Sequence, residues 1–345
     1  MGNVPRRILV SGLICIAVLA VPRGAGAVQP DSAVQASRDI ADAVLAGDYR
    51  QAEDIAGRFR DVNPGHPAGS LMLASVIQYE AIDYEDFSRG GDFEELLGET
   101  ERLADERLAD DSDDLWAHYY RAAAYGLAGS WSSITGSVLT GIIRGRSGAV
   151  QMDRIIDADS TFFDAYLLWG SYHFWKSVAT RRIAWLPFIE DEKEQGIDEV
   201  TTAIRRGMMT GPLSNTVLLE MLLEDDPRRA LDLSVELTGR YPGCRLFAWQ
   251  RGEAAKKLGM FDEACSVFSA IAEEMRDDPA DDGSGELSCW WKLAVLAFDL
   301  DDRSRCADYC RRVIDIGESP SVDARQRERI ERARELLREC GDERD

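Results

Sequence analysis

The chain has 345 residues, of which 30% are charged and 45% hydrophobic, and its formal net charge at pH 7 is −22. A charge this negative repels nucleic acid and anionic membrane surfaces, so the sequence argues against both as partners. The length suffices for two compact domains, unless the chain is a repeat array, for which a domain count has little meaning.

The first 27 residues predict a cleavable export signal. Arg6 and Arg7 precede an apolar run from Ile8 to Val21, Pro22 ends the run, and small residues follow at Ala25–Ala27. The alternative is an uncleaved membrane anchor, for which the run is short. Cleavage after Ala27 removes three arginines and no acidic residue, so the net charge becomes −25. We therefore expect a periplasmic or secreted protein with a signal peptide at residues 1–27.

Paired helices are expected from Ala33 onward. The unit from Ala33 to His66 has a turn at Gly47 and ends at Asn63–Pro64, and a degenerate unit begins at Pro67. Further units begin at Leu115 and Phe163. The units from 67, 115 and 163 are longer than the later ones, so we expect insertions between their paired helices.

Two of these insertions have recognisable composition. Residues near 130–146 carry Trp131, Ile134, Val138, Ile142 and Ile143 at helical spacing, which predicts a third short helix there. Residues near 177–195 include a segment from Arg181 to Phe188 that combines arginines with aromatic residues in an otherwise acidic protein. This segment is the candidate for contact with a lipid head group or anionic partner, or else it packs back over the helices.

The last third of the chain shows the repeat most clearly. Units run from Gly211 to Cys244, from Arg245 onward and from Leu287 to Pro320, each with a period near 34 residues. The unit from Arg245 has small residues, a turn glycine and aromatic residues at regular positions: Gly252, Gly259, Phe261, Ala264 and Phe268. Small residues allow two helices to approach closely, and bulky ones fill the space between hairpins.

This pattern resembles the tetratricopeptide repeat. The resemblance implies an all-α, tetratricopeptide-like helical hairpin solenoid of about seven hairpins over residues 28–320. A strongly charged helix from Val322 to Glu339 then predicts a capping helix and tail at residues 321–345. The segment from Leu168 to Ile197, with Trp185–Phe188 at its centre, also resembles the tetratricopeptide family named for inclusion-body clearance. We take only architecture from that second likeness.

No catalytic motif stands out. His66, His118 and His173 are far apart in sequence, and His173 falls where the repeat places a packing aromatic, which favours a core histidine. The stretch from Asp278 to Cys289 has the glycine of a calcium loop but lacks its final glutamate. We therefore expect no enzyme, no cofactor and no metal site.

Six cysteines remain after signal removal, all in the last third of the chain: Cys244, Cys265, Cys289, Cys306, Cys310 and Cys340. An even count in an exported protein suggests disulfides, and six cysteines allow fifteen connectivities. Cys306 and Cys310 stand one helical turn apart and are poorly placed to pair with each other. Cys265 with Cys289 is a plausible pair, and burial of all six as free core thiols is the alternative.

The likeness to tetratricopeptide proteins implies a concave groove lined by the first helix of each hairpin. Its expected partner-binding residues are Trp116, Tyr119, Phe174, Trp175, Trp249, Lys256, Trp291 and Phe298. Aromatic residues at helical spacing are also typical of the core between helices, so both interpretations stay open.

The function that this suggests is an exported scaffold that binds a protein or peptide partner in the cell envelope. The alternatives are a carrier of a hydrophobic ligand, with a closed pocket between the Trp131–Ile143 segment and Trp169/Trp175, or an accessory subunit of an envelope enzyme.

Overall fold

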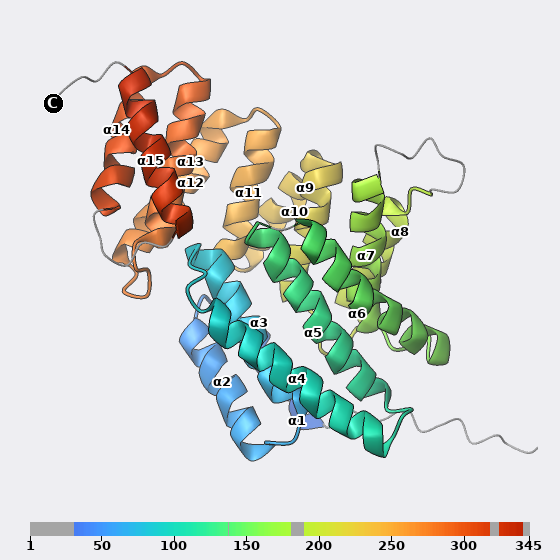
Figure 1. Cartoon of the computed structure of the whole chain (residues 1–345). Coiled ribbons are helices and arrows are strands. Elements are labelled where there is room, and N and C mark those ends of the chain that lie inside the picture. The colour runs from blue at the N-terminus through green and yellow to red at the C-terminus, as the bar shows by residue number, and fades with distance from the viewer. Residues whose placement is uncertain (1–30, 137, 181–189, 318–323, 341–345) are drawn as a thin grey trace, which may run out of the picture.

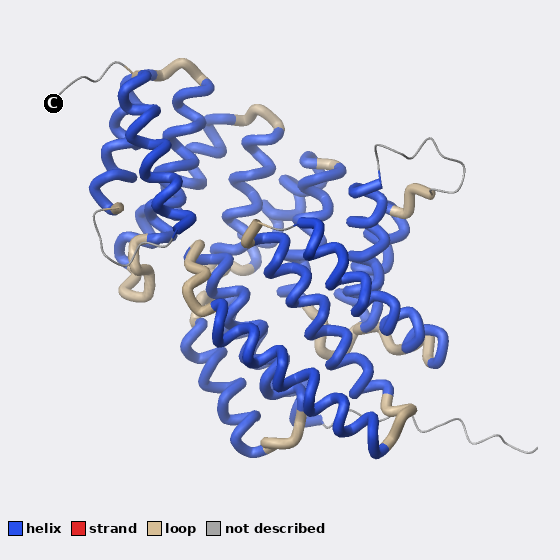
Figure 2. The backbone as a smooth tube through the Cα atoms, in the orientation of Figure 1, coloured by secondary structure: helices blue, strands red, loops and turns tan. Residues whose placement is uncertain are grey.

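The structure is a computed structural model that describes residues 31–136, 138–180, 190–317 and 324–340. Within these ranges all regular structure is helical (Figure 2). The expected signal peptide and the Arg181–Phe188 segment lie outside the described residues. None of the described helices has the length and apolar composition needed to cross a membrane.

The described helices form seven consecutive hairpins and one final helix (Figure 1). The hairpins are α1 (Asp31–Leu45) with α2 (Tyr49–Val62), α3 (Pro67–Tyr84) with α4 (Gly90–Asp110), α5 (Leu115–Ile134) with α6 (Val138–Ala158), α7 (Ala165–Thr180) with α8 (Lys193–Arg206), α9 (Asn215–Asp225) with α10 (Pro227–Arg240), α11 (Arg245–Lys257) with α12 (Phe261–Asp277), and α13 (Ser284–Asp299) with α14 (Arg303–Ile316). A 3₁₀ turn, η2 (Pro212–Ser214), precedes α9, and α15 (Ala324–Glu339) packs on α14 and α13. The predicted fold, about seven hairpins with a capping helix, is confirmed.

Aspartates before the helices explain where several of them begin. Asp48, Asp114, Asp226 and Asp302 each accept hydrogen bonds from backbone N–H groups in the first turn of α2, α5, α10 and α14. Such caps satisfy donors that the helix itself leaves unpaired, and each contributes about 1 kcal/mol.

Small residues set how closely the paired helices approach. A side-chain carbon at Gly252 in α11 would lie 2.5 Å from the ring of Phe268 in α12. Likewise, one at Gly170 in α7 would lie 2.6 Å from the carbonyl oxygen of Gly196 in α8. Gly252, which the repeat pattern singles out, and Gly170 are therefore packing positions.

The third helix expected near residues 130–146 is not formed by the described residues. Instead, α5 continues to Ile134 and α6 begins at Val138, so the additional residues lengthen both helices of this hairpin. Glycines make the long contact possible, because side-chain carbons at Gly129 and Gly148 would lie 2.8 and 2.6 Å from carbonyl oxygens of the facing helix. Trp131 stacks on Phe93 of α4, with ring centroids 4.3 Å apart.

The two ends of the solenoid contact each other. Helix α3 packs on α11 and α13, and α1 packs on η2, although these elements are far apart in sequence (Figure 1). The turn after α1 meets the turn before α11 so closely that a side-chain carbon at Gly243 would lie 2.8 Å from the carbonyl oxygen of Ala46. The hairpins thus curve until the first ones close against the later ones.

Candidate functional site

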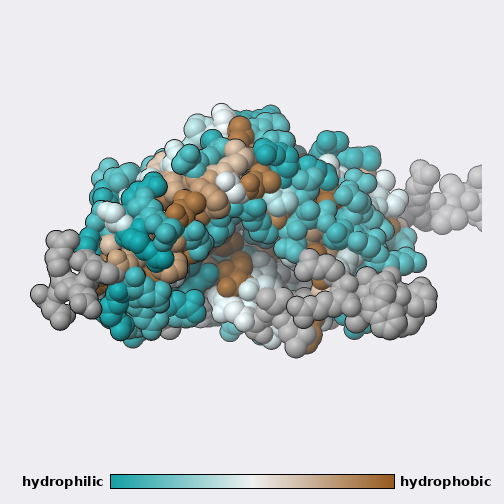
Figure 3. Space-filling view, turned by 90° about the horizontal axis from the view of Figure 1, so that it is seen from above, coloured by the Kyte–Doolittle hydropathy of each residue, from teal (hydrophilic) through white to brown (hydrophobic). Residues whose placement is uncertain are grey.

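The first helices of the hairpins form the inner layer of the solenoid. Consecutive members of the set α1, α3, α5, α7, α9 and α11 contact one another. Seen from above, the molecule has a depression near its centre, with apolar residues around it and hydrophilic rims (Figure 3). The sequence predicts partner binding on the first helices of the hairpins.

Four of the eight predicted partner-binding residues are buried in contacts between helices. Trp116 and Tyr119 of α5 pack around Phe162, with ring centroids 4.4 and 5.5 Å from it. Phe174 of α7 and Trp249 of α11 are also buried. These four side chains have little accessible surface for a partner to contact. Their packing agrees with the alternative interpretation that they belong to the core between helices.

The other four predicted residues are partly exposed on the first helices α7, α11 and α13. Trp175 lies on α7, Lys256 near the end of α11, and Trp291 and Phe298 on α13. Arg303 covers one face of the Phe298 ring at 4.3 Å, and Lys256 pairs with Glu253 at 3.3 Å. These four remain available for the predicted role.

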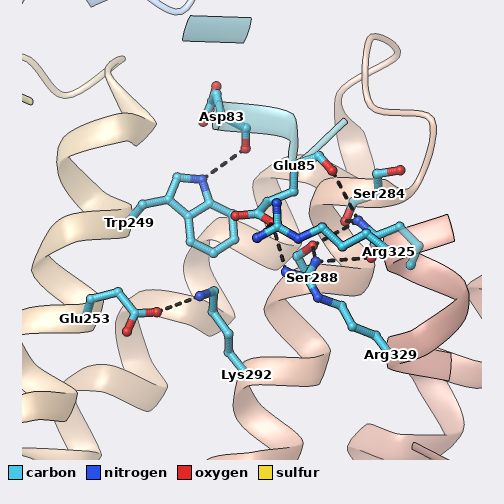
Figure 4. Close-up of polar contacts among 10 residues, drawn as sticks. Asp83, Glu85, Trp249, Glu253, Ser284, Ser288, Lys292, Arg325 and Arg329 are labelled. Atoms are coloured by element: carbon cyan, nitrogen blue, oxygen red, sulfur yellow. Dashed lines mark hydrogen bonds and ion pairs between the residues drawn. The ribbon is translucent and has the colours of Figure 1, made fainter. Parts of the chain in front are cut away.

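The repeat pattern does not predict that another part of the chain occupies the inner face of the later hairpins. The occupant is the end of α3, residues Asp83, Tyr84 and Glu85, which we call the α3 tip. Figure 4 shows Asp83 and Glu85 beside Trp249 of α11 and the polar side chains of α13 and α15. Helix α3 suits this position because its apolar residues lie on all sides, so it is buried all round.

Asp83 holds the tip against α11. Its buried carboxylate accepts from Arg245 Nε at 3.1 Å and lies 2.8 Å from Nη2 of the same guanidinium as an ion pair, and its backbone carbonyl accepts from the indole Nε1 of Trp249 at 3.1 Å. Arg245 also reaches Asp278 at 3.0 Å, and Asp278 accepts from the Tyr84 hydroxyl at 2.8 Å. Burial raises the pKa of Asp83 above its ordinary value, and this effect outweighs the lowering by Arg245.

Glu85 holds the tip against the capping helix. Its carboxylate pairs with Arg329 at 2.9 Å and with Arg325 at 3.5 Å, and its backbone carbonyl accepts from Gln326 Nε2 at 3.2 Å. Burial opposes ionisation, but Arg329, Lys292 and Arg325 outweigh it and keep the pKa of Glu85 below its ordinary value. The capping helix α15 therefore also binds another part of the same chain, the α3 tip.

Beside the tip, the inner face carries a charged pair. Lys292 of α13 donates to Glu253 of α11 at 2.6 Å and lies 5.6 Å from the centroid of the Trp249 ring (Figure 4). Although burial opposes ionisation of Glu253, Lys292 and Lys256 lower its pKa. Glu253 is thus charged near neutral pH, and both side chains are partly accessible.

A second acidic group on a first helix also has a shifted pKa. Glu220 of α9 is exposed by its accessible area, yet surrounding protein raises its pKa to about 7 through desolvation. Burial raises the pKa of Tyr79 of α3 to about 12, and the charge of Glu220 adds to this shift.

The remaining sequence candidates have structural partners. His173 is buried and bonds Glu199 at 2.6 Å, as expected of a core histidine. In the stretch that resembles a calcium loop, Asp281 accepts from the backbone N–H groups of Gly285 and Glu286 at the start of α13. Within the described ranges, no group of three or more His, Cys, Asp or Glu side chains is arranged to hold a metal ion.

The six cysteines are free thiols in this structure. Cys265 is partly exposed and Cys289 is buried, and no bond joins the pair that the sequence favours. The sulfur atoms of Cys306 and Cys340 lie 3.0 Å apart.

Comparisons with known proteins find a likeness of fold only. No family profile matches the chain, and no curated protein is significantly similar to it. A crystal structure of a tetratricopeptide repeat protein from Parabacteroides merdae is 14% identical in sequence. The match covers 91% of this chain and 100% of that chain, with a TM-score of 0.41.

Proposed function

We propose that this protein is an exported, non-catalytic scaffold that binds a protein or peptide partner in the cell envelope through the inner face of its helical repeats. The observation that carries the proposal is the α3 tip. The inner face of the later hairpins already holds a short piece of polypeptide by its main chain and its side chains.

The contacts to the tip are of the kind that recognise a peptide. Trp249 and Gln326 each donate to a main-chain carbonyl, while Arg245 and Arg329 each bind a carboxylate. Main-chain contacts supply affinity without regard to sequence, and charge-assisted contacts add selectivity. The inner face that remains, with Trp175, Lys256, Trp291 and Phe298, offers aromatic and charged groups for a further segment.

The test is affinity capture from a cell-envelope fraction with wild type and the double variant Trp291→Ala plus Phe298→Ala. We expect the double variant to lose partners that the wild type retains, with an unchanged helical circular dichroism spectrum. The matched control is Val62→Ala plus Val235→Ala, which removes exposed apolar side chains from the second helices α2 and α10. Equal recovery of the same partners by all three proteins would contradict a role for this face.

Export has a separate test. Expression of the full chain in a bacterial host should place the protein outside the cytoplasm with Val28 as its first residue, as determined by N-terminal sequencing. Recovery in the cytoplasm with Met1 to Ala27 intact would contradict export without affecting the binding test.

The ligand-carrier alternative receives no support from Trp131. That ring is buried against Phe93 and lies 5.3 Å from Phe87, so it fills the contact with α4. Ile143, at the other end of the same segment, is exposed.

A further inference from the structure

Three cysteine thiols meet where the capping helix joins the last hairpin. Cys306 and Cys310 are fully buried on α14, and Cys340 directly follows α15. The sulfur atoms of Cys340 and Cys306 are 3.0 Å apart, although the residues are 34 positions apart in sequence. A disulfide bond is about 2.05 Å long, so the two sulfurs need to approach by only about 1 Å.

The geometry selects one pair from the three thiols. Cys306 and Cys310 stand on the same face of one helix, a turn apart, where side chains point in parallel and do not reach each other's bonding position. Cys306 lies between the other two, because it contacts both Cys340 and Cys310. Cys306 with Cys340 is therefore the pair that joins two different helices.

The surroundings of the thiols give them different roles. Burial raises the pKa of Cys306 and raises that of Cys310 to about 11, so both stay protonated near neutral pH. Cys340 is partly exposed, and the guanidinium of Arg303 lies against its sulfur. Because Cys340 is the accessible thiol of the three, an oxidant reaches it first.

We propose that Cys306 and Cys340 form a disulfide that fixes the capping helix α15 to α14, with a low-molecular-weight or protein disulfide as the oxidant. The Cys340 thiolate attacks one sulfur of the donor disulfide and releases one donor thiol. Cys306 then attacks the Cys340 sulfur and expels the second donor thiol, to which the Cys306 proton passes. The two cysteines lose two electrons and two protons, and the donor disulfide is reduced to two thiols.

The bond acts on the site that holds the α3 tip. Arg325, Gln326 and Arg329, which bind Glu85, all lie on α15. Described residues of α15 pack through Ile330 and Ala333, which are buried, but much of this charged helix is exposed. A covalent link at its end therefore restricts separation of α15 from α14 and keeps its arginines beside the tip.

The reaction in solution does not depend on export, whereas its occurrence in the cell rests on the export proposed above, because cytosolic thiols are kept reduced. The test treats the purified full chain with oxidised glutathione, blocks the remaining thiols with N-ethylmaleimide and maps peptides under non-reducing conditions. We expect a Cys306–Cys340 cross-linked peptide, two hydrogens lighter than the sum of its parts. Hydrogen exchange of α15 amides should slow by roughly tenfold or more on oxidation.

Two variants make the result specific. Cys340→Ser should lose both the cross-link and the oxidation-dependent slowing, while Cys265→Ser, which removes another partly exposed thiol, should keep both. If both Cys306 and Cys340 of the wild type are found alkylated after treatment with oxidised glutathione, the proposal is overturned. A stable glutathione adduct on Cys340, or a cross-link to Cys310, would overturn it as well. A cross-link with unchanged exchange of α15 would overturn its proposed effect on the capping helix.

Discussion

Asp83 and Glu85 lie two residues apart at the end of one helix, yet their surroundings shift their pKa values in opposite directions. Burial dominates at Asp83 and raises its pKa, whereas three cations overcome burial at Glu85 and lower it. A buried charge is costly unless enough partners surround it. Glu85 is therefore the anchor that remains charged, and Asp83 depends on the single guanidinium of Arg245.

His66 makes the stability of the folded protein depend on pH in the acidic range. Its Nδ1 accepts from the backbone N–H of Ala68 at the start of α3, and its Nε2 lies 3.3 Å from Arg107. Burial and then Arg107 lower the pKa of His66 to about 4 in the folded protein, compared with about 6.5 for an unperturbed histidine. As the pH falls below 6.5, the unfolded chain binds the proton before the folded protein does.

The expected result is a loss of stability of up to about 3 kcal/mol as the pH falls from about 6.5 to 4. His66→Asn keeps a cap acceptor and cannot titrate, so its free energy of unfolding should depend less on pH across this window. Urea denaturation at pH 7, 5.5 and 4.5 measures both proteins. Parallel pH profiles for the two would exclude His66 as the source of acid sensitivity.

At the scale of elements, the repeat pattern predicts the hairpins well because it is local. Gly252, Phe268 and the turn glycines act between neighbouring helices, and the structure places them there. The length of α5 and α6 was harder to predict, since glycines between residues 126 and 148 suggest breaks. In the structure Gly129, Gly141 and Gly148 lie in one continuous contact between the two helices, and Gly136 lies in the turn that joins them.

The α5–α6 contact predicts opposite effects for two neighbouring glycines of one helix. A side-chain carbon at Gly148 would lie 2.6 Å from the carbonyl oxygen of Ala122, whereas one at Gly145 meets nothing within 4 Å. Gly148→Ala should therefore destabilise the protein by about 2 kcal/mol, because backbone must shift. Gly145→Ala should stabilise it by roughly 0.5–1 kcal/mol through helix propensity. Chemical denaturation compares them, and equal effects would contradict this packing.

Partner-binding residues were predictable only in part, for a similar reason. A repeat position tells which helix face a residue is on, but not whether another segment covers that face. Trp249 is at a groove position and is nevertheless buried, because the α3 tip lies on it. The half-exposed Trp291 occupies the corresponding position of the next hairpin.

For the whole molecule, closure of the solenoid is the property that cannot be predicted from the sequence. Asp83 and Arg245 are 162 residues apart, and a repeat whose units contact their neighbours contains no signal for such a pair. Closure makes distant hairpins depend on one another, whereas an open solenoid unfolds nearly unit by unit. The contacts at the α3 tip should therefore control both the dimensions and the cooperativity of the protein.

Substitutions of two arginines of α11 distinguish contacts between distant hairpins from contacts within one hairpin. Arg245 joins distant hairpins through Asp83, while Arg251 joins α11 to its own partner α12 through Glu263 at 2.7 Å. Arg245→Ala leaves a buried carboxylate without its cation, which typically costs about 3–5 kcal/mol. Arg251→Ala removes a half-exposed pair and should cost about 1 kcal/mol or less.

Small-angle X-ray scattering should show a larger radius of gyration for Arg245→Ala alone, and its urea transition should broaden or split. If both variants keep the wild-type radius of gyration and a single sharp transition, the pair of Arg245 with Asp83 is dispensable for closure. The α3 tip is then not what closes the solenoid.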